Sequence, residues 1–215
     1  MTSTAQDPAL LATLSEHRLV PVVVIDDARS ADALGDGLVS GGLPVAEVTF
    51  RTDAGVEALR RLADRGDLLV GAGTVLTPGQ VDEAVRAGAA FVVSPGFSRP
   101  VVERCLEHRV LALPGAVTAT EIQAALELGL NTVKFFPAES SGGAAAVRAL
   151  AAPFVGVQFM PTGGIGPANL ADYLALPAVR AVGGSWMVPR AGIDDARAVA
   201  LLVQQAVHLA ASLRP

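Results

Sequence analysis

The sequence predicts an α/β protein, specifically a (β/α)8 TIM barrel with an additional short N-terminal helix. Two observations support this fold class. Eight short apolar runs, rich in residues that favour strands, recur every ~20 to 30 residues, as repeated βα units require. Polar residues gather at the ends of many of these runs, and in barrels the functional groups collect at the carboxyl ends of the strands. An open doubly wound sheet is the other architecture that this alternation admits.

The eight predicted strands are distributed along the whole chain. In order they are LVPVVVI (19–25), VAEVTF (45–50), DLLVGAGTV (67–75), AAFVVSPG (89–96), VLALPG (110–115), NTVKFFP (131–137), VGVQFMP (155–161) and VRAVGGS (179–185). The chain has 215 residues, a length at which α/β barrels commonly form a single domain. Because no linker, low-complexity tract or charge run divides it, we expect one barrel domain over residues 1–215.

Helix-capping patterns support the helical segments between these runs. Asp7 followed by Pro8 predicts the start of a short helix ahead of the first strand. Residues 77–80 and 118–121 each begin with Thr and end with Gln or Glu, which is the spacing of a capping box. Gly88 and Gly129 stand where the two corresponding helices should end, because glycine readily adopts the left-handed conformation needed there.

The composition narrows the class of protein. A formal net charge of −5 argues against a general nucleic-acid-binding protein, which usually presents a basic stripe. No window approaches the ~18 uninterrupted apolar residues of a membrane-spanning helix. The start of the chain lacks the pattern of an export signal, so we expect a cytoplasmic protein. Cys105, the single cysteine, permits no internal disulfide and is expected to be a packed helix residue.

Charged residues occur within two of the predicted strands. Because side chains alternate along a strand, one face of the second strand carries Glu47, Thr49 and Arg51, and one face of the sixth carries Thr132, Lys134 and Phe136. Their apolar neighbours can pack against outer helices, so these polar faces should point into the barrel. The two strands lie on opposite sides of such a barrel, so Glu47 and Lys134 can meet across its axis. Burying either charge alone is costly, which favours their pairing.

Lys134 is the only lysine in a chain that contains fifteen arginines. One interpretation is a structural ion pair with Glu47. Arginine would serve that purpose at least as well, because its planar fork matches a carboxylate and its charge is permanent. A lysine can instead lose its proton and attack a carbonyl carbon. Schiff-base chemistry at Lys134, with Glu47 as the proton carrier, is therefore the favoured interpretation.

The loops after the seventh and eighth strands are rich in glycine. Barrels often hold a phosphate between these two loops, where glycine permits close approach and backbone N–H groups converge on the anion. The candidates for phosphate binding are Thr162, Gly163, Gly164, Gly184 and Ser185.

The third strand ends in GAGTV, which resembles part of a dinucleotide-binding motif. Leu76 occupies the position of the third glycine, so we reject that interpretation. Thr74 and Arg51 instead offer a hydroxyl and a cation for a small carboxylate. The three histidines fall away from the carboxyl ends of the strands, so no metal site is expected.

Seven stretches follow one another from the second strand to just beyond the eighth: EVTFRT, VGAGTVL, SPGF, LPG, VKFFPAE, PTGGIGPAN and GGSWMVP. The most specific of them is KFFPAE with EVTFRT upstream. Together they resemble the class I 2-keto-3-deoxy-6-phosphogluconate (KDPG) aldolases, a family that includes the 4-hydroxy-2-oxoglutarate (KHG) aldolases. The resemblance covers most of the chain.

This resemblance implies a role for each candidate residue. Lys134 corresponds to the Schiff-base lysine and Glu47 to the general acid/base. The residues expected around the pyruvate portion of the substrate are Arg51, Thr74, Pro95 and Phe136. Those expected toward the phosphate are Thr162, Gly163, Gly164, Gly184 and Ser185. The resemblance also implies a (β/α)8 barrel that assembles as a homotrimer and uses no metal or organic cofactor. One departure from the family pattern is the segment after the eighth strand, RAGIDDAR, which is shorter than in some members.

The implied reaction is the reversible cleavage of 2-dehydro-3-deoxy-6-phosphogluconate to pyruvate and D-glyceraldehyde 3-phosphate, a step of the Entner–Doudoroff pathway. An aldolase that prefers 4-hydroxy-2-oxoglutarate or the 6-phosphogalactonate epimer is an alternative, because one pocket can suit several aldols of pyruvate. A non-catalytic sugar-phosphate-binding barrel, in which Lys134 is only an ion-pair partner, is an alternative of a different class.

Overall fold

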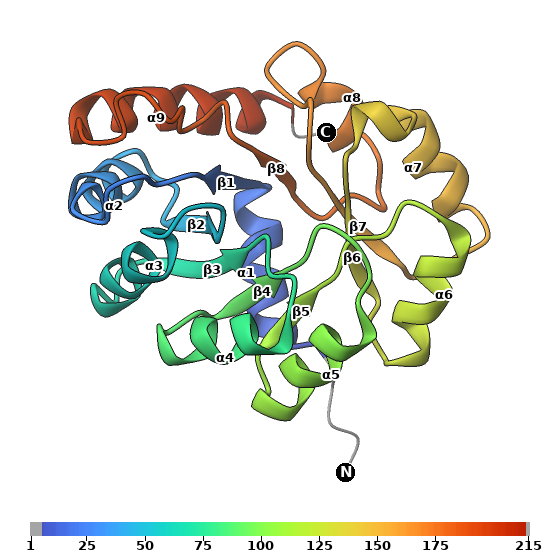
Figure 1. The fold of residues 1–215 in the computed structure, drawn as a ribbon. Helices are drawn as coiled ribbons and strands as arrows, with labels where there is room; N and C mark the ends of the chain where they lie inside the picture. Colours follow the sequence, from blue (N-terminus) through green and yellow to red (C-terminus); the bar gives the residue numbers. More distant parts are fainter. Residues whose placement is uncertain (1–5, 214–215) are drawn as a thin grey trace.

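In the computed structural model, which describes residues 6–213, parallel strands form a closed ring that is surrounded by helices (Figure 1). The strands are β1 (Leu19–Val23), β2 (Val45–Thr49), β3 (Leu69–Gly73), β4 (Phe91–Val93), β5 (Leu111–Leu113), β6 (Thr132–Phe135), β7 (Gln158–Pro161) and β8 (Val182–Gly184). Each lies within one of the eight predicted runs, in the same order. The strand predictions are therefore confirmed.

Backbone hydrogen bonds join the strands in two parallel ladders and close the ring between them. One ladder has the order β5-β4-β3-β2-β1-β8, and the other pairs β6 with β7. Isolated bridges span the two remaining seams, Gly115 with Lys134 between β5 and β6, and Thr162 with Gly183 between β7 and β8. The sheet is a barrel, as predicted, and the open doubly wound alternative is wrong.

Helices surround the barrel and one more helix precedes it. They are α1 (Pro8–His17), α2 (Ser30–Ser40), α3 (Gly55–Asp64), α4 (Pro78–Arg86), α5 (Arg99–His108), α6 (Ala119–Glu127), the 3-10 helix η1 (Glu139–Ser141), α7 (Gly143–Ala151), α8 (Leu170–Leu174) and α9 (Ala196–Ser212). The helix predicted before the first strand is α1, so this part of the fold prediction is also confirmed. Among residues 6–213, none of the helices combines the length and apolarity that crossing a membrane demands.

The caps of three helices agree with the sequence patterns, with one difference. The Asp7 carboxylate accepts from the backbone N–H of Ala9 at the start of α1. Residues 118–121 form a complete capping box at the start of α6. At the start of α4, the Thr77 hydroxyl accepts from the Gln80 N–H, but the Gln80 side chain accepts from Leu76 rather than from Thr77. This interaction ties the loop after β3 to the helix instead of completing the box.

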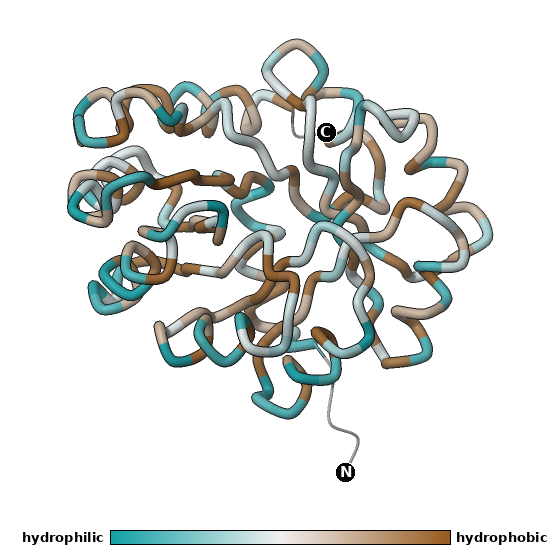
Figure 2. The backbone as a smooth tube through the Cα atoms, in the orientation of Figure 1, coloured by the Kyte–Doolittle hydropathy of each residue, from teal (hydrophilic) through white to brown (hydrophobic). Residues whose placement is uncertain are grey.

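The apolar core has two layers. Outward-facing strand residues such as Val23, Val48 and Phe135 pack against the helices. Inward-facing residues near the amino ends of the strands form a second cluster inside the barrel, which includes Val20, Val45, Phe91 and Leu111 together with Leu11 and Leu14 of α1. Figure 2 shows this apolar character along the central strands, whereas the peripheral helices alternate between hydrophobic and hydrophilic residues. Helix α1 therefore closes the amino end of the barrel and leaves the carboxyl ends for a site.

The side chain of Gln6 forms hydrogen bonds to both β5 and β6, two strands that no regular ladder of backbone hydrogen bonds joins. Its side-chain Nε2 donates to the carbonyl oxygens of Ala112, at 2.8 Å, and Thr132, at 2.9 Å. Its Oε1 accepts from the backbone N–H groups of Asn131, at 3.0 Å, and Thr132, at 2.9 Å. The side chain thus supplies the hydrogen bonds that a neighbouring strand would otherwise provide.

Replacing Gln6 with Ala should lower the free energy of unfolding by about 2–4 kcal/mol, because buried backbone groups of β5 and β6 lose their partners. Denaturant unfolding measures this change. Gln204→Ala is the matched control, since the Gln204 amide is exposed and makes a 3.3 Å hydrogen bond to Ser40. Equally small changes in the free energy of unfolding for the two substitutions would show that the hydrogen bonds of Gln6 to β5 and β6 do not stabilise the barrel.

Candidate active site

The buried ion pair between Lys134 and Glu47 lies at the centre of the barrel. Lys134 Nζ, from β6, donates to Glu47 Oε1, from β2, over 2.9 Å. The two side chains are 4% and 0% exposed, respectively. The expected meeting of these residues across the barrel axis is therefore confirmed. Glu47 Oε2 is also buried and has no hydrogen-bond partner among the described residues, so one carboxylate oxygen is left to accept a further proton.

Gly73 of β3 makes room for the Glu47 carboxylate. A Cβ on Gly73 would lie 2.4 Å from Glu47 Oε1, closer than side-chain atoms can pack. Thr49 of β2 pairs with Gly73 in the parallel ladder, so this glycine lies beside the strand that carries Glu47. The sequence analysis noticed the GAGTV stretch but missed this role. The alternation of β3, which points Gly71 and Gly73 into the barrel, is the signal that could have found it.

The Lys134 amino group lies over the aromatic ring of Phe136. The Lys134 Nζ atom lies 5.2 Å from the centre of this ring, a distance at which an ammonium group is attracted to the aromatic face. Phe136 immediately follows β6, and its side chain lines a cavity at the carboxyl ends of the strands. The lysine is thus placed just beneath this cavity.

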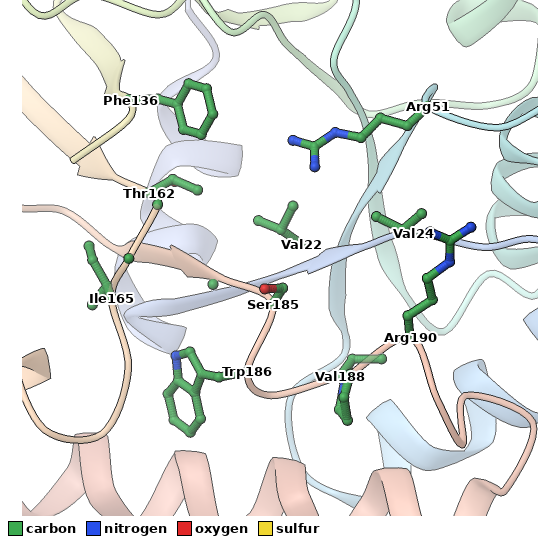
Figure 3. Close-up of a pocket in the computed structure, with 14 residues that line it drawn as sticks. Val22, Val24, Arg51, Phe136, Thr162, Ile165, Ser185, Trp186, Val188 and Arg190 are labelled. Carbon is green, nitrogen blue, oxygen red and sulfur yellow. The ribbon is translucent and has the colours of Figure 1, made fainter. Parts of the chain in front are cut away.

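The cavity has a volume of about 530 Å³ and collects most of the predicted site residues (Figure 3). The predicted residues that line it are Arg51, Phe136, Thr162, Gly163, Gly164, Gly184 and Ser185. They come from the carboxyl end of β8 and from the segments that follow β2, β6, β7 and β8, so these distant segments converge. A volume of this size suits a small organic ligand.

Thr74 is not among the residues that line the cavity, but it contacts Arg51, which is. The Arg51 Nε atom donates to the Thr74 hydroxyl over 3.1 Å, so the two predicted carboxylate-binding residues are in contact. Thr74 has a φ of 59°, a left-handed conformation that a β-branched residue adopts only with strain. Strained backbone of this kind persists where the surrounding structure holds it, commonly at functional sites. Here it accompanies the contact between the Thr74 hydroxyl and the guanidinium group.

Pro95 lies next to the lysine strand but outside the residues that line the cavity. Gly115, which forms a β-bridge with Lys134, faces the Pro95 carbonyl so closely that a Cβ there would lie 2.1 Å from the oxygen. Pro95 is therefore connected to Lys134 through Gly115. The structure places it as a neighbour of the lysine backbone.

The glycine-rich loop after β7 passes close to the segment after β6. Gly163 and Gly164 have φ values of 103° and 78°, which residues with side chains rarely adopt. The backbone N–H groups of Ala138 and Glu139 donate to the carbonyl oxygens of Thr162 and Gly163 over 2.8 and 3.1 Å, respectively. These bonds hold the loop that contributes the predicted phosphate-binding residues against the segment that follows Lys134.

An ion pair at the mouth of the cavity was missed by the sequence analysis. Arg190, in the segment after β8, lines the cavity, and its guanidinium group donates two hydrogen bonds to the carboxylate of Asp26, in the segment after β1. The hydrogen bond from Arg190 lowers the pKa of Asp26 below its ordinary value. The residues are 164 positions apart, so no local pattern signals their contact.

The histidines and the cysteine lie outside this site. His108, at the end of α5, contacts the Asp82 carboxylate over 2.6 Å, and burial lowers the pKa of His17 in α1. Cys105 is fully buried in α5, as expected, and burial raises the pKa of its thiol to about 12. Within residues 6–213, no cluster of three or more His, Cys, Asp or Glu side chains has the arrangement of a metal site.

Comparison with protein families now identifies the class of protein. Residues 10–201 match the family model "Aldolase: KDPG and KHG aldolase". A 2-dehydro-3-deoxy-phosphogluconate aldolase from Treponema pallidum is 48% identical over 203 residues, which cover 93% of this chain and 97% of that protein. A KHG/KDPG aldolase from Escherichia coli K12 is 43% identical over 198 residues, with 91% and 93% covered. The barrel with its buried lysine is thus that of an aldolase.

Within the aldolases, this chain belongs to the KDPG and KHG aldolase family. Solved structures agree. A KDPG aldolase from Legionella pneumophila, with pyruvate captured as a covalent carbinolamine intermediate, has a TM-score of 0.87 and 38% identity, covering 91% of this chain and 96% of that one. The aldolase from Zymomonas mobilis ZM4 with 3-phosphoglycerate has a TM-score of 0.87 and 39% identity, covering 91% and 93%.

Gly73→Ala should reduce kcat/KM by about 10²-fold, because the new methyl group displaces the carboxylate that bonds to Lys134. Aldol cleavage rates, measured together with thermal unfolding, test this expectation. Gly79→Ala is the matched control, since a Cβ there has its nearest contact at 3.9 Å from the Thr77 hydroxyl. Full activity of Gly73→Ala would mean that the position of the Glu47 carboxylate is unimportant.

Cys105 should resist thiol reagents at pH 8 and react only once denaturant unfolds the protein, because it is buried and its pKa is raised. The unfolded thiol ionises near its ordinary value of 9.0, whereas the folded thiol ionises near 12. Ionisation of Cys105 should therefore favour unfolding as the pH rises above about 9. Rapid labelling of the native protein at pH 8 would contradict this description.

Proposed function

We propose that this protein is a class I aldolase that reversibly cleaves 2-dehydro-3-deoxy-6-phosphogluconate to pyruvate and D-glyceraldehyde 3-phosphate. The observation that carries the proposal is the 2.9 Å contact between Lys134 Nζ and Glu47 Oε1, buried beneath a cavity that holds the cation Arg51. An amine next to a carboxylate combines a nucleophile with a proton acceptor. The relatives with this activity in their names are up to 48% identical to this chain.

The reaction begins when the Lys134 amine, after transferring a proton to Glu47, attacks the C2 carbonyl carbon of the substrate. Glu47 returns this proton to the hydroxyl group of the carbinolamine, which leaves as water, so that Glu47 is again a carboxylate and the nitrogen forms an iminium. The iminium attracts the electrons of the neighbouring C3–C4 bond. Glu47 accepts the proton of the C4 hydroxyl as this bond breaks, and the aldehyde is released. The enamine of pyruvate that remains on Lys134 takes a proton at C3, and water then hydrolyses the iminium to free pyruvate.

The proposed substrate contacts follow the two ends of the cavity. Arg51 and Thr74 bind the carboxylate beside the keto group, and Phe136 and Pro95 shape the space around the pyruvate portion. The phosphate lies at the other end, against the segments that follow β7 and β8. The residues proposed there are Thr162, Gly163, Gly164, Gly184 and Ser185. Glycines at these positions leave backbone N–H groups accessible to an anion.

4-Hydroxy-2-oxoglutarate is a second candidate substrate, because the Escherichia coli relative is named a KHG/KDPG aldolase. Both compounds present the same keto acid end to Lys134 and Arg51. Comparing kcat/KM for 2-dehydro-3-deoxy-6-phosphogluconate, its galactonate epimer and 4-hydroxy-2-oxoglutarate distinguishes the candidates.

We further propose that the protein forms a homotrimer, as the family resemblance implies, and sedimentation equilibrium measures this directly.

Lys134→Arg should give a folded protein with no detectable cleavage of 2-dehydro-3-deoxy-6-phosphogluconate. Arginine keeps the positive charge beside Glu47 but cannot act as the nucleophile at neutral pH. A coupled assay for pyruvate measures cleavage, and circular dichroism checks the fold. Wild-type turnover by this variant would eliminate the Schiff-base mechanism.

Glu47→Gln should reduce kcat by ~10²–10⁴-fold, because glutamine retains the size of the side chain but cannot accept a proton. Steady-state kinetics at saturating substrate measure this change. The amide can still accept a hydrogen bond from Lys134, so the variant separates proton transfer from packing. Unchanged kcat would remove Glu47 from the proposed role.

A further inference from the structure

Glu139 is the last residue of KFFPAE, the most specific stretch of the sequence, and the proposed mechanism gives it no role. It lies in η1, which follows the strand that carries Lys134. The described residues that line the cavity of the candidate active site do not include Glu139. Together with Tyr173 it lines a second cavity instead, beside α7 and α8. Glu139 can therefore affect the reaction only through other residues.

The Glu139 side chain packs against the loop between β7 and α8, residues 162–169, which we call the β7 loop. A Cβ on Gly164 would lie 2.7 Å from Glu139 Cγ, so the side chain touches the backbone of this glycine. Asn169 holds the same loop from its other end. Its Nδ2 donates to the Gly164 carbonyl oxygen over 3.2 Å, and its Oδ1 accepts from the Gly166 N–H over 2.8 Å.

Tyr173 fixes the position of the Glu139 carboxylate. The Tyr173 hydroxyl donates to Glu139 Oε1, and the tyrosine is only 1% exposed. Burial, and then the hydrogen bond to Glu139, raise the pKa of Tyr173, so the hydroxyl keeps its proton and remains a donor at neutral pH. Tyr173 belongs to α8, which begins where the β7 loop ends. The hydrogen bond thus joins this helix to η1.

The β7 loop forms part of the wall of the active-site cavity. Thr162, Gly163, Gly164 and Ile165 line it, and Figure 3 shows Thr162 and Ile165 on the side opposite Arg190. Two adjacent glycines do not hold one conformation by themselves, because glycine populates many backbone conformations. The shape of this wall therefore depends on the residues that pack against the loop from outside the cavity.

We propose that Glu139, held by Tyr173, is a positioning residue that fixes the conformation of the β7 loop and thereby the affinity for the aldehyde portion of the substrate. This inference rests on the proposed aldolase function. The keto acid portion is bound by Lys134 and Arg51, which lie outside the β7 loop. Loss of the positioning contact should therefore weaken substrate binding and leave the chemical step intact.

Glu139→Ala should raise KM for 2-dehydro-3-deoxy-6-phosphogluconate by about tenfold, the effect expected for one lost hydrogen bond to a charged group. Its kcat should stay within about twofold of the wild-type value, because the reacting groups are unchanged. Glu139→Gln should restore a KM close to that of the wild type. Glutamine keeps an oxygen that accepts from Tyr173 and a side chain that packs against Gly164.

Tyr173→Phe tests the same contact from its other side, because it removes the hydroxyl and keeps the ring in the core. It should also raise KM. Adding it to Glu139→Ala should cause no further rise, because both substitutions break one hydrogen bond. A wild-type KM for a folded Tyr173→Phe variant would overturn the proposal even if Glu139→Ala failed to fold.

Asp172→Ala is the matched control. Asp172 precedes Tyr173 and lines the same second cavity, so its removal deletes the same charge from the same part of the molecule. The Glu139–Tyr173 hydrogen bond stays in place. Loss of a negative charge alone weakens the repulsion of an anionic substrate and would lower KM. Asp172→Ala should therefore not raise KM, and an equal rise for both alanine variants would contradict a positioning role.

Borohydride trapping of pyruvate separates this inference from the aldolase function. Pyruvate lacks the aldehyde portion, so Glu139→Ala should trap it at Lys134 as fast as the wild type. An unchanged KM in Glu139→Ala, no recovery in Glu139→Gln, or slower trapping of pyruvate by Glu139→Ala would overturn the inference. Failure of the wild type to trap pyruvate and to cleave any of the keto acids would count against the aldolase function itself.

Discussion

The buried contact between Lys134 and Glu47 is the interaction on which the rest of the site depends. Removing two charges from water is costly, and their attraction compensates only when the geometry is favourable. The barrel supplies that geometry from several directions. Gly73 leaves space for the carboxylate, and the bridge between Gly115 and Lys134 fixes the lysine backbone against β5. The catalytic chemistry that we propose therefore rests on the rigid strands.

The cavity above this ion pair is formed by segments that follow the strands. Its lining contains more polar groups than the interior at the amino end of the barrel. The amino end of the barrel is filled by apolar side chains and by α1, whereas the carboxyl end presents glycines, hydroxyls and arginines. The strained backbone of Thr74 lies at this boundary, where its hydroxyl accepts from Arg51. The fold thus separates the part that maintains stability from the part that selects a substrate.

The sequence alone predicts the strands, the barrel and the central ion pair, because these depend on local periodicity. Alternation within two strands suffices to place Glu47 and Lys134 on inward faces, and their positions as the second and sixth of eight strands place those strands opposite one another. Contacts such as Gln6 with β6 and Asp26 with Arg190 could not be predicted in this way. They join segments separated by 126 and 164 residues, and only the closed barrel brings those segments together. Pro95 lies between these two cases. The family resemblance identified it as a site residue, but only the structure shows that it is connected to Lys134 through Gly115.

The most direct test of the proposed chemistry is the intact mass of the protein after incubation with pyruvate and borohydride, followed by peptide mapping. Borohydride reduces an imine to a stable secondary amine, and the single lysine leaves only the N-terminal amine as a competitor. We predict a pyruvate-dependent adduct on Lys134, within the peptide that contains NTVKFFPAES. Folded protein with no adduct at Lys134 would contradict the Schiff-base mechanism and would favour a structural ion pair in a barrel that only binds sugar phosphates.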